Sequence, residues 1–218
     1  MISYKDLNLS GITYLDQVEG FPGLYWGTDF TAGDLYEAEE LYRAGHKIKS
    51  NRLVFVTYPE GKVYEPLMAI DGQYFGKPVG SNGCVYILEV DFKAQNIMIH
   101  SWTLKARSLR SEAVIPLSEV KDCYNLMLDI EPLTLIRQGH EDVFDVVWPE
   151  KGSFPIDPSE SFDYRENGYL VFSKWYEDPD YREEVVIRKY PSGEILETFP
   201  GTMMTMPDGQ KWLLKGKK

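Results

Sequence analysis

Carboxylates beside tryptophans are the residues in this chain whose types could do chemistry. The acids at the ends of apolar, strand-like segments are Asp91, Asp129, Asp145 and Asp163. Hydrolysis of a glycosidic bond requires two carboxyl groups, about 5 Å or about 6.5–9.5 Å apart, on either side of a sugar. Aromatic rings offer flat apolar faces for stacking, and the candidates are Trp102, Trp148 and Trp175. One interpretation of the sequence is therefore a carbohydrate-active hydrolase that uses paired carboxylates.

An acidic, aromatic loop is the second candidate site. Residues 177–184 read Glu-Asp-Pro-Asp-Tyr-Arg-Glu-Glu and join two strong strand patterns. Loop tips that are displayed on a rigid sheet often carry binding function. We expect this loop to be solvated and to be where a basic partner would bind. The candidate binding residues are Glu177, Asp178, Asp180, Tyr181, Glu183, Trp102, Trp148 and Trp175.

Motifs for metals, nucleotides and nucleophilic catalysis are missing from the sequence. The three histidines are far apart, and the densest group of potential ligands is His140-Glu141-Asp142 followed by Asp145. Gly139 places that group in a turn, where a solvated polar tip is expected. Zinc-ligand spacing, a phosphate-binding glycine loop and a nucleophile elbow are all absent. We predict no catalytic residue, no metal site and no cofactor.

The charge of the chain limits its partners. With 23 Lys+Arg against 34 Asp+Glu, the net charge is −11. Nucleic acids and anionic membranes attract basic surfaces, so both are disfavoured as partners. A basic protein is permitted, and a carbohydrate fits the aromatic residues. The first residues contain no signal peptide pattern, which predicts a cytoplasmic protein. We therefore favour a non-catalytic binding or protein-interaction domain over the hydrolase.

Three similar turns indicate which elements hold these residues in place. Residues 58–61, 190–193 and 206–209 each read apolar-Pro-polar-Gly. Proline at the second position and glycine at the fourth are typical of a type I turn, and strand-forming residues follow each copy. The repeated turn predicts that β-hairpins dominate the fold.

The remaining patterns predict one β-rich domain over residues 1–218 with a single helix. Acidic residues, helical spacing and Gly45 predict a helix at about 34–44 that covers a sheet. Alternating or apolar runs predict strands from Arg52 onward. The stretch 149–168 contains several prolines and glycines, which predict a long loop.

A short repeat resembles the blades of a β-propeller. Residues 87–91 align with 127–131 at a spacing of 40, and 171–175 follow at 44. Propeller blades recur at about 40–45 residues, and the Pro-Asp-Gly turn at 207–209 is similar to turns in such blades. The resemblance implies small antiparallel sheets around an axis. Residues 58–65 separately resemble one unit of the short hairpin repeats called MORN. A sandwich or mixed antiparallel sheet with one covering helix stays an open alternative.

Overall fold

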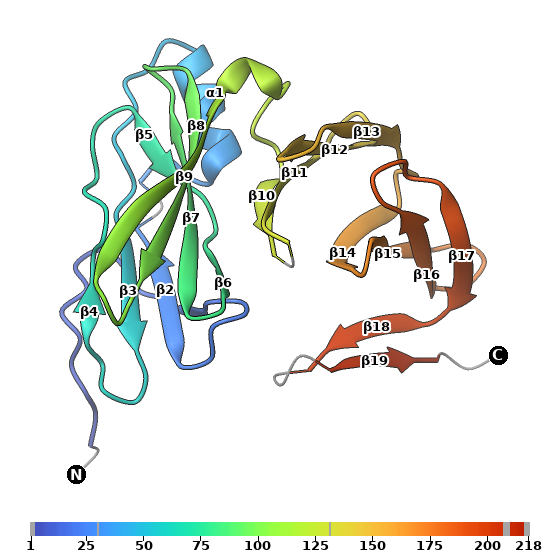
Figure 1. Cartoon of the computed structure of the whole chain (residues 1–218), viewed down its shortest axis with the longest axis horizontal. Coiled ribbons are helices and arrows are strands. Elements are labelled where there is room, and N and C mark those ends of the chain that lie inside the picture. The colour runs from blue at the N-terminus through green and yellow to red at the C-terminus, as the bar shows by residue number, and fades with distance from the viewer. Residues whose placement is uncertain (1–2, 30, 131, 207–209, 216–218) are drawn as a thin grey trace. The chain divides into compact units, whose positions relative to one another are not determined.

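The computed structural model describes residues 3–29, 31–130, 132–206 and 210–215. Small antiparallel sheets and one α-helix make up its regular structure (Figure 1). The predicted fold class, a mainly β protein of hairpins with one N-terminal helix, is confirmed. The chain divides into two compact units, residues 1–128 and 129–218. The single β-rich domain that the sequence suggests stays a prediction.

The helix α1 spans Leu35–Arg43, close to the predicted range. Asp34 caps it, because the Asp34 carboxylate accepts a hydrogen bond from the Glu37 backbone N–H while the Glu37 carboxylate accepts one from the Asp34 N–H. Such a capping box satisfies two of the donors that are left free at a helix N-terminus. Gly45 follows the last turn at φ +83°, a conformation that suits glycine. The buried Ala38 shows that one face of α1 packs inward.

Two sheets form the first unit. One has the order β1-β2-β3-β4, and the other has the order β5-β7-β8-β9 with β6 also paired to β7. Their buried side chains form one cluster that includes Phe55 and Leu24 from the first sheet and Ile87 and Trp102 from the second. The strands are β1 (Asp16–Gln17), β2 (Leu24–Thr28), β3 (Leu53–Thr57), β4 (Val63–Tyr64), β5 (Gln73–Phe75), β6 (Val79–Ser81), β7 (Cys84–Asp91), β8 (Asn96–Thr103) and β9 (Ser108–Pro116). A short 3-10 turn follows at Leu117–Glu119.

Two four-stranded meanders and a hairpin follow, with the orders β10-β11-β12-β13, β14-β15-β16-β17 and β18-β19. A meander of four antiparallel strands is the form of a propeller blade. Rings of Phe144, Phe154, Phe162 and Phe172 pack together between the two meanders, at centroid distances of 5.0–6.3 Å. The strands are β10 (Leu126–Asp129), β11 (Thr134–Gly139), β12 (Val143–Trp148), β13 (Gly152–Pro155), β14 (Glu160–Glu166), β15 (Tyr169–Tyr176), β16 (Arg182–Lys189), β17 (Ile195–Pro200), β18 (Thr202–Thr205) and β19 (Lys211–Leu214).

The repeated turns join hairpins as predicted, with one difference in their geometry. The Gly61 N–H donates to the Thr57 carbonyl at 2.7 Å, and the Gly193 N–H donates to the Lys189 carbonyl at 2.8 Å. Each closing bond therefore reaches one residue further back than in a type I turn. Both glycines have a positive φ, +69° and +73°. In the third copy, the tip at 207–209 lies outside the described residues.

The stretch 149–168 is not the long loop that its prolines and glycines predict. It contains β13 and β14, with the buried Phe154 and the half-buried Phe162 packed in the phenylalanine cluster. Pro155 ends β13, which is an edge strand of its sheet and therefore tolerates proline. Alternation in β14 is interrupted by a bulge between Phe162 and Tyr164, which hides its period of two.

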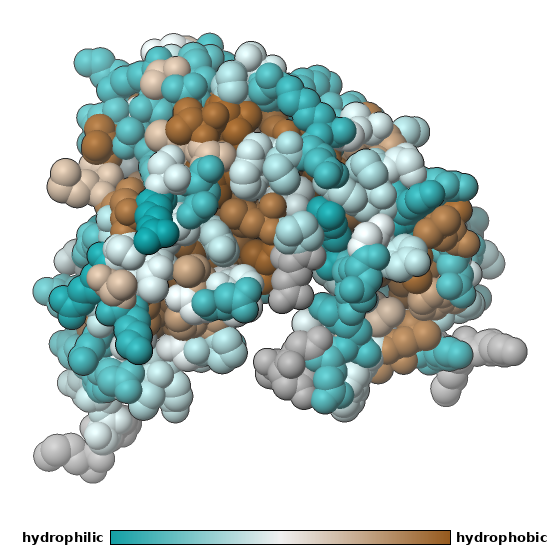
Figure 2. Space-filling model, in the orientation of Figure 1, coloured by the Kyte–Doolittle hydropathy of each residue, from teal (hydrophilic) through white to brown (hydrophobic). Residues whose placement is uncertain are grey.

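The surface combines charged regions with exposed apolar side chains. Figure 2 shows hydrophobic surface beside hydrophilic surface at the C-terminal hairpin, where Met204 and Leu214 are 45% and 47% exposed. No helix within the described ranges is both long enough and apolar enough to cross a lipid bilayer.

Candidate functional site

The acidic loop between β15 and β16 projects from a fully paired hairpin. The two strands pair without interruption from Tyr169–Lys189 to Tyr176–Arg182. Arg182 fixes the base of the loop, because its guanidinium donates to the Asp178 carbonyl at 3.2 Å and lies 3.9 Å from the ring centroid of Tyr176. Phe172 of β15 packs into the phenylalanine cluster, which holds this strand in place. The acidic loop is therefore held on the rigid base that β15 and β16 form.

The carboxylates at the loop tip face solvent. Glu177, Asp178 and Asp180 are exposed, and among the described residues none of these three carboxylates has a recorded ion pair. Tyr181 is 68% exposed next to them. Because these charges lack counter-ions, they can attract a cationic partner without first breaking an internal pair.

Glu183 is held more tightly than the acids at the tip. Its carboxylate accepts hydrogen bonds from the hydroxyl groups of Thr202 and Tyr181. These bonds lower the pKa of Glu183, and the bond to Glu183 raises the pKa of Tyr181. Glu183 therefore carries a negative charge at neutral pH and orients the ring of Tyr181.

The three tryptophans have different environments. Trp175 is 42% exposed and lies opposite Glu183 in the β15–β16 ladder, so it shares a surface with the acidic loop. Trp148 is half-buried at the end of β12. Trp102 is 3% exposed in the core of the first unit, where its ring packs on Phe55 and Tyr64. Of the three, Trp175 is thus the ring that adjoins the predicted loop.

The strand-end carboxylates considered for hydrolysis have local structural partners. Asp91 accepts hydrogen bonds from the backbone of Lys93 and Ala94 and so shapes the β7–β8 turn. Asp145 pairs with Arg137 at 2.9 Å and also accepts a hydrogen bond from Ser153.

Asp163 differs from these carboxylates because it lies at the bulge of β14. It accepts a hydrogen bond from the Ser173 hydroxyl at 3.1 Å. Packing around the carboxyl group, with a smaller contribution from the nearby Glu183, raises the pKa of Asp163 to about 6 against the lowering effects of Ser173 and Lys211. Asp163 is nevertheless an exposed residue, and solvent screening weakens such a shift.

The cluster that follows His140 serves to pair a buried arginine. Arg137 is fully buried, and its guanidinium contacts the carboxylates of Glu141 at 3.0 Å and Asp145 at 2.9 Å. Across the described residues, no group of three or more His, Cys, Asp or Glu side chains could hold a metal ion. Glu141 from the turn and Asp145 from β12 neutralise an internal charge.

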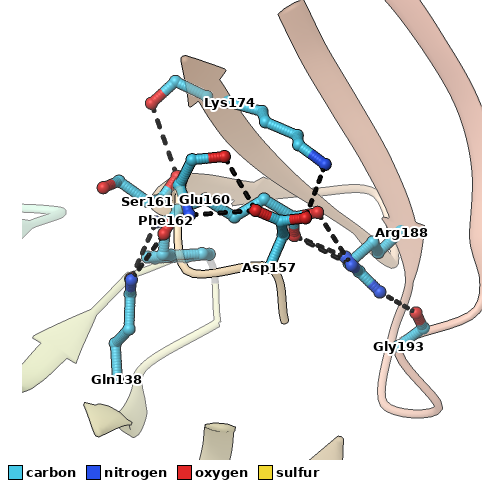
Figure 3. A network of polar contacts seen from close by, with 10 residues as sticks. Gln138, Asp157, Glu160, Ser161, Phe162, Lys174, Arg188 and Gly193 are labelled. Atoms are coloured by element: carbon cyan, nitrogen blue, oxygen red, sulfur yellow. Dashed lines mark hydrogen bonds and ion pairs between the residues drawn. The ribbon is translucent and has the colours of Figure 1, made fainter. Parts of the chain in front are cut away.

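Sequence reasoning missed a buried polar network beneath the second meander. The Glu160 carboxylate faces the Arg188 guanidinium (Figure 3). Their charged atoms are 2.8 Å apart. Arg188 also donates to the Gly193 carbonyl, and Gln138 donates to the Glu160 carbonyl. Lys174 pairs with Asp157 at the edge of the network. A charged residue inside a predicted strand, such as Arg188, is a signal for such a network. Its partner could not be identified, because that partner is distant in the sequence.

Sequence reasoning also missed a groove on the β14–β17 sheet. It has a volume of about 490 Å³ and opens to solvent. Apolar side chains of Val171, Ile187 and Leu196 and the rings of Tyr164 and Tyr169 line it. Glu166, Asn167 and Glu197 complete its lining.

Comparisons with known proteins yield little for this chain. The sequence matches no family model and no curated protein. A solved structure of Pyrococcus horikoshii acylaminoacyl peptidase, in an orthorhombic crystal form, is similar with a TM-score of 0.46 and 13% sequence identity. The match covers 94% of this chain and 36% of the peptidase chain. This chain therefore spans about a third of that protein, and a likeness of this size does not establish a shared activity.

Proposed function

We propose that this chain is a non-catalytic interaction domain that binds a basic protein through the loop between β15 and β16. The observation that carries the proposal is the set of exposed carboxylates at the loop tip, Glu177, Asp178 and Asp180, beside Trp175 and Tyr181. Aromatic residues supply most of the energy at many protein interfaces. Charges that surround them accelerate association with an oppositely charged partner.

The rigid base of the loop supports the same proposal. A preformed loop loses little conformational entropy on binding, so more of the contact energy becomes affinity. The Arg182 contacts and the uninterrupted β15–β16 ladder supply that order. The net charge of −11 adds long-range attraction for a basic partner.

The test is affinity capture from the lysate of the source organism, at low and at moderate salt, with identification by mass spectrometry. The variant E177Q/D178N/D180N should lose a stoichiometric basic protein that the unmodified chain retains. The matched control E60Q/D71N/E194Q removes three exposed carboxylates elsewhere and should retain it. Equal recovery by both variants would show that the loop does not bind the partner.

A carbohydrate-active hydrolase is the second candidate, and one observation favours it. Asp163 accepts a hydrogen bond from Ser173, and Glu183 lies opposite Trp175 on the same face of the sheet, where the pKa of Asp163 is raised and that of Glu183 is lowered. Paired-acid catalysis uses such a difference, with one group protonated and the other ionised. Trp175 lies opposite Glu183 and could stack on a sugar.

This candidate predicts slow hydrolysis of a 4-nitrophenyl glycoside by the unmodified chain. Both D163N and E183Q should abolish the release of 4-nitrophenol, whereas D71N, at an exposed site elsewhere, should not. If a panel of glycosides is not hydrolysed, or if the two variants retain the rate, the hydrolase is excluded and the interaction domain is favoured.

A further inference from the structure

The two faces of the β14–β17 sheet differ in how they are covered. On one face, Phe162 and Phe172 pack against Phe144 and Phe154 of the preceding meander. On the other face, the groove holds Tyr169, which is 47% exposed. The structural unit that follows in the chain, β18-β19, has two strands instead of four. It contacts this sheet through β16 and through Lys211, which lies over the ring of Tyr164, and the groove still opens to solvent.

The lining of the groove combines an apolar floor with negative charge. Val171 and Ile187 form part of the floor, and Glu166 and Glu197 belong to the lining from the two edge strands. Glu166 accepts a hydrogen bond from the Asn167 amide at 3.5 Å. No ion pair to Glu166 or Glu197 is recorded among the described residues. These two carboxylates outnumber the Lys211 ammonium group that lies over Tyr164, so the groove complements a ligand that has an apolar stem and a positive head.

Two tyrosine rings in the second unit, residues 129–218, already contact cationic side chains. The ammonium group of Lys211 lies 3.8 Å from the ring centroid of Tyr164, which also lines the groove. The guanidinium of Arg165 lies 3.4 Å from the ring centroid of Tyr190. A cation over an aromatic face is attracted by the negative charge density of the ring. Tyr169 offers a second ring in the groove, more exposed than that of Tyr164.

From this chemistry we infer that the groove binds an arginine side chain of the basic partner. The inference rests on the proposed interaction function. It adds that an arginine of the partner gives that interaction its specificity. Guanidinium is planar and weakly hydrated, and its donors can pair with a carboxylate while its face stacks on a tyrosine. Lysine concentrates its charge on a strongly hydrated ammonium group and lacks that face. A second copy of this chain is a poor occupant, because its net charge of −11 repels an acidic groove.

The test uses NMR titration with the peptide acetyl-Gly-Ser-Gly-Arg-Gly-Ser-Gly-amide. Saturable shifts are expected at the methyl groups of Val171, Ile187 and Leu196. A peptide with citrulline, which keeps the shape of arginine without its charge, should bind about fivefold more weakly or worse. The lysine peptide should fall between them. Equal binding of arginine and citrulline, or shifts outside the groove, would overturn the inference.

Variants of exposed groove residues give an independent measurement. E166Q and E197Q should each weaken the arginine peptide about threefold. The control E194Q, at an exposed site on the neighbouring turn, should not change its affinity. Because the loop variant E177Q/D178N/D180N leaves the groove intact, it should bind the peptide normally. Unchanged affinity in E166Q and E197Q would refute the arginine site, while the capture experiment on the loop would still decide the proposed function.

Discussion

Glu160 and Arg188 form a buried ion pair. Their side chains are 2% and 8% exposed, and their charged groups meet at 2.8 Å. Burying two charges costs solvation energy, and their attraction and hydrogen bonds offset that cost. Arg188 uses its remaining donor capacity on the Gly193 carbonyl. The pair therefore connects the start of β14, the end of β16 and the turn at 190–193.

Removing one partner should leave the other as an unpaired buried charge. We expect E160Q to lower the free energy of unfolding by about 3 kcal/mol, measured by urea denaturation. R188M should have a similar effect. The double variant E160Q/R188M should be more stable than the sum of the two single losses implies. Strict additivity would show that the two charges do not interact in the folded protein.

Asp157 provides a pH-dependent prediction. The hydrogen bond from Lys174, with further bonds from Ser159, lowers the pKa of Asp157 to about 2. A carboxyl group with a lowered folded-state pKa stabilises the fold above its unfolded pKa. That contribution disappears as the pH falls from about 4 to about 2.

The variant D157N should therefore be less stable than the unmodified chain at pH 7, by less than about 1 kcal/mol because the pair is partly exposed. Below about pH 2 the difference should shrink towards zero. Urea denaturation at several pH values measures both, and D71N serves as the exposed control. A difference that stays constant down to pH 2 would assign the effect to something other than ionisation.

Some residues of the candidate site could be predicted from the sequence, and others could not. The run at 177–183 signals its own exposure, because acidic residues and a proline between two strand patterns favour a loop. The sequence around Trp102 does not show whether this ring is a binding residue or a core residue. An apolar run predicts that a strand is buried, but it does not identify the side chains that pack against it. The groove depends on side chains from four strands brought together by hairpin pairing, and single-strand patterns do not reveal that neighbourhood.

At the level of elements, the turns at 58–61 and 190–193 allow a matched comparison. Gly61 and Gly193 have nearly the same φ, +69° and +73°. A Cβ on Gly193 would come within 2.0 Å of the Phe154 ring, whereas on Gly61 its nearest contact is the flexible Lys5 side chain at 2.7 Å. The two glycines thus share a backbone requirement but differ in packing.

We expect G61A to cost about 1 kcal/mol, the usual cost of a left-handed alanine. G193A should cost about 3 kcal/mol, because overpacking against the core adds to the backbone cost. Thermal unfolding of both variants measures the difference. Equal losses would show that the Phe154 ring moves aside freely.

Elements with local signals were predicted closely, and elements defined by distant partners were not. Acidic residues, helical spacing and the glycine at 45 marked the helix to within a residue at each end. β13 and β14 were missed because turn residues around them outweighed their short patterns. The spacing near 40 also misleads in detail. Residues 87–91 and 171–175 lie in the second strands of their sheets, whereas 127–129 lie in the first.

For the whole molecule, the net charge of −11 predicts strongly salt-dependent association. Long-range attraction operates within the Debye length, which shrinks from more than 20 Å at about 20 mM salt to less than 10 Å at about 300 mM. The association rate with the captured basic partner should fall at least about tenfold over that range. Stopped-flow mixing measures it. A rate that does not respond to salt would mean that charge does not steer the encounter.

The hairpin β18-β19 has a consequence for dynamics. A two-stranded sheet has few ladder bonds and is marginally stable alone, and the side chains of Trp212 and Leu214 are about half exposed. Its side-chain contacts with the β14–β17 sheet include the hydrogen bond from Thr202 to Glu183 and the ammonium group of Lys211 over the Tyr164 ring. Its amide hydrogens should therefore exchange with deuterium well before those of β15 and β16. The C-terminal end would open and close repeatedly while the rest of the protein stays folded.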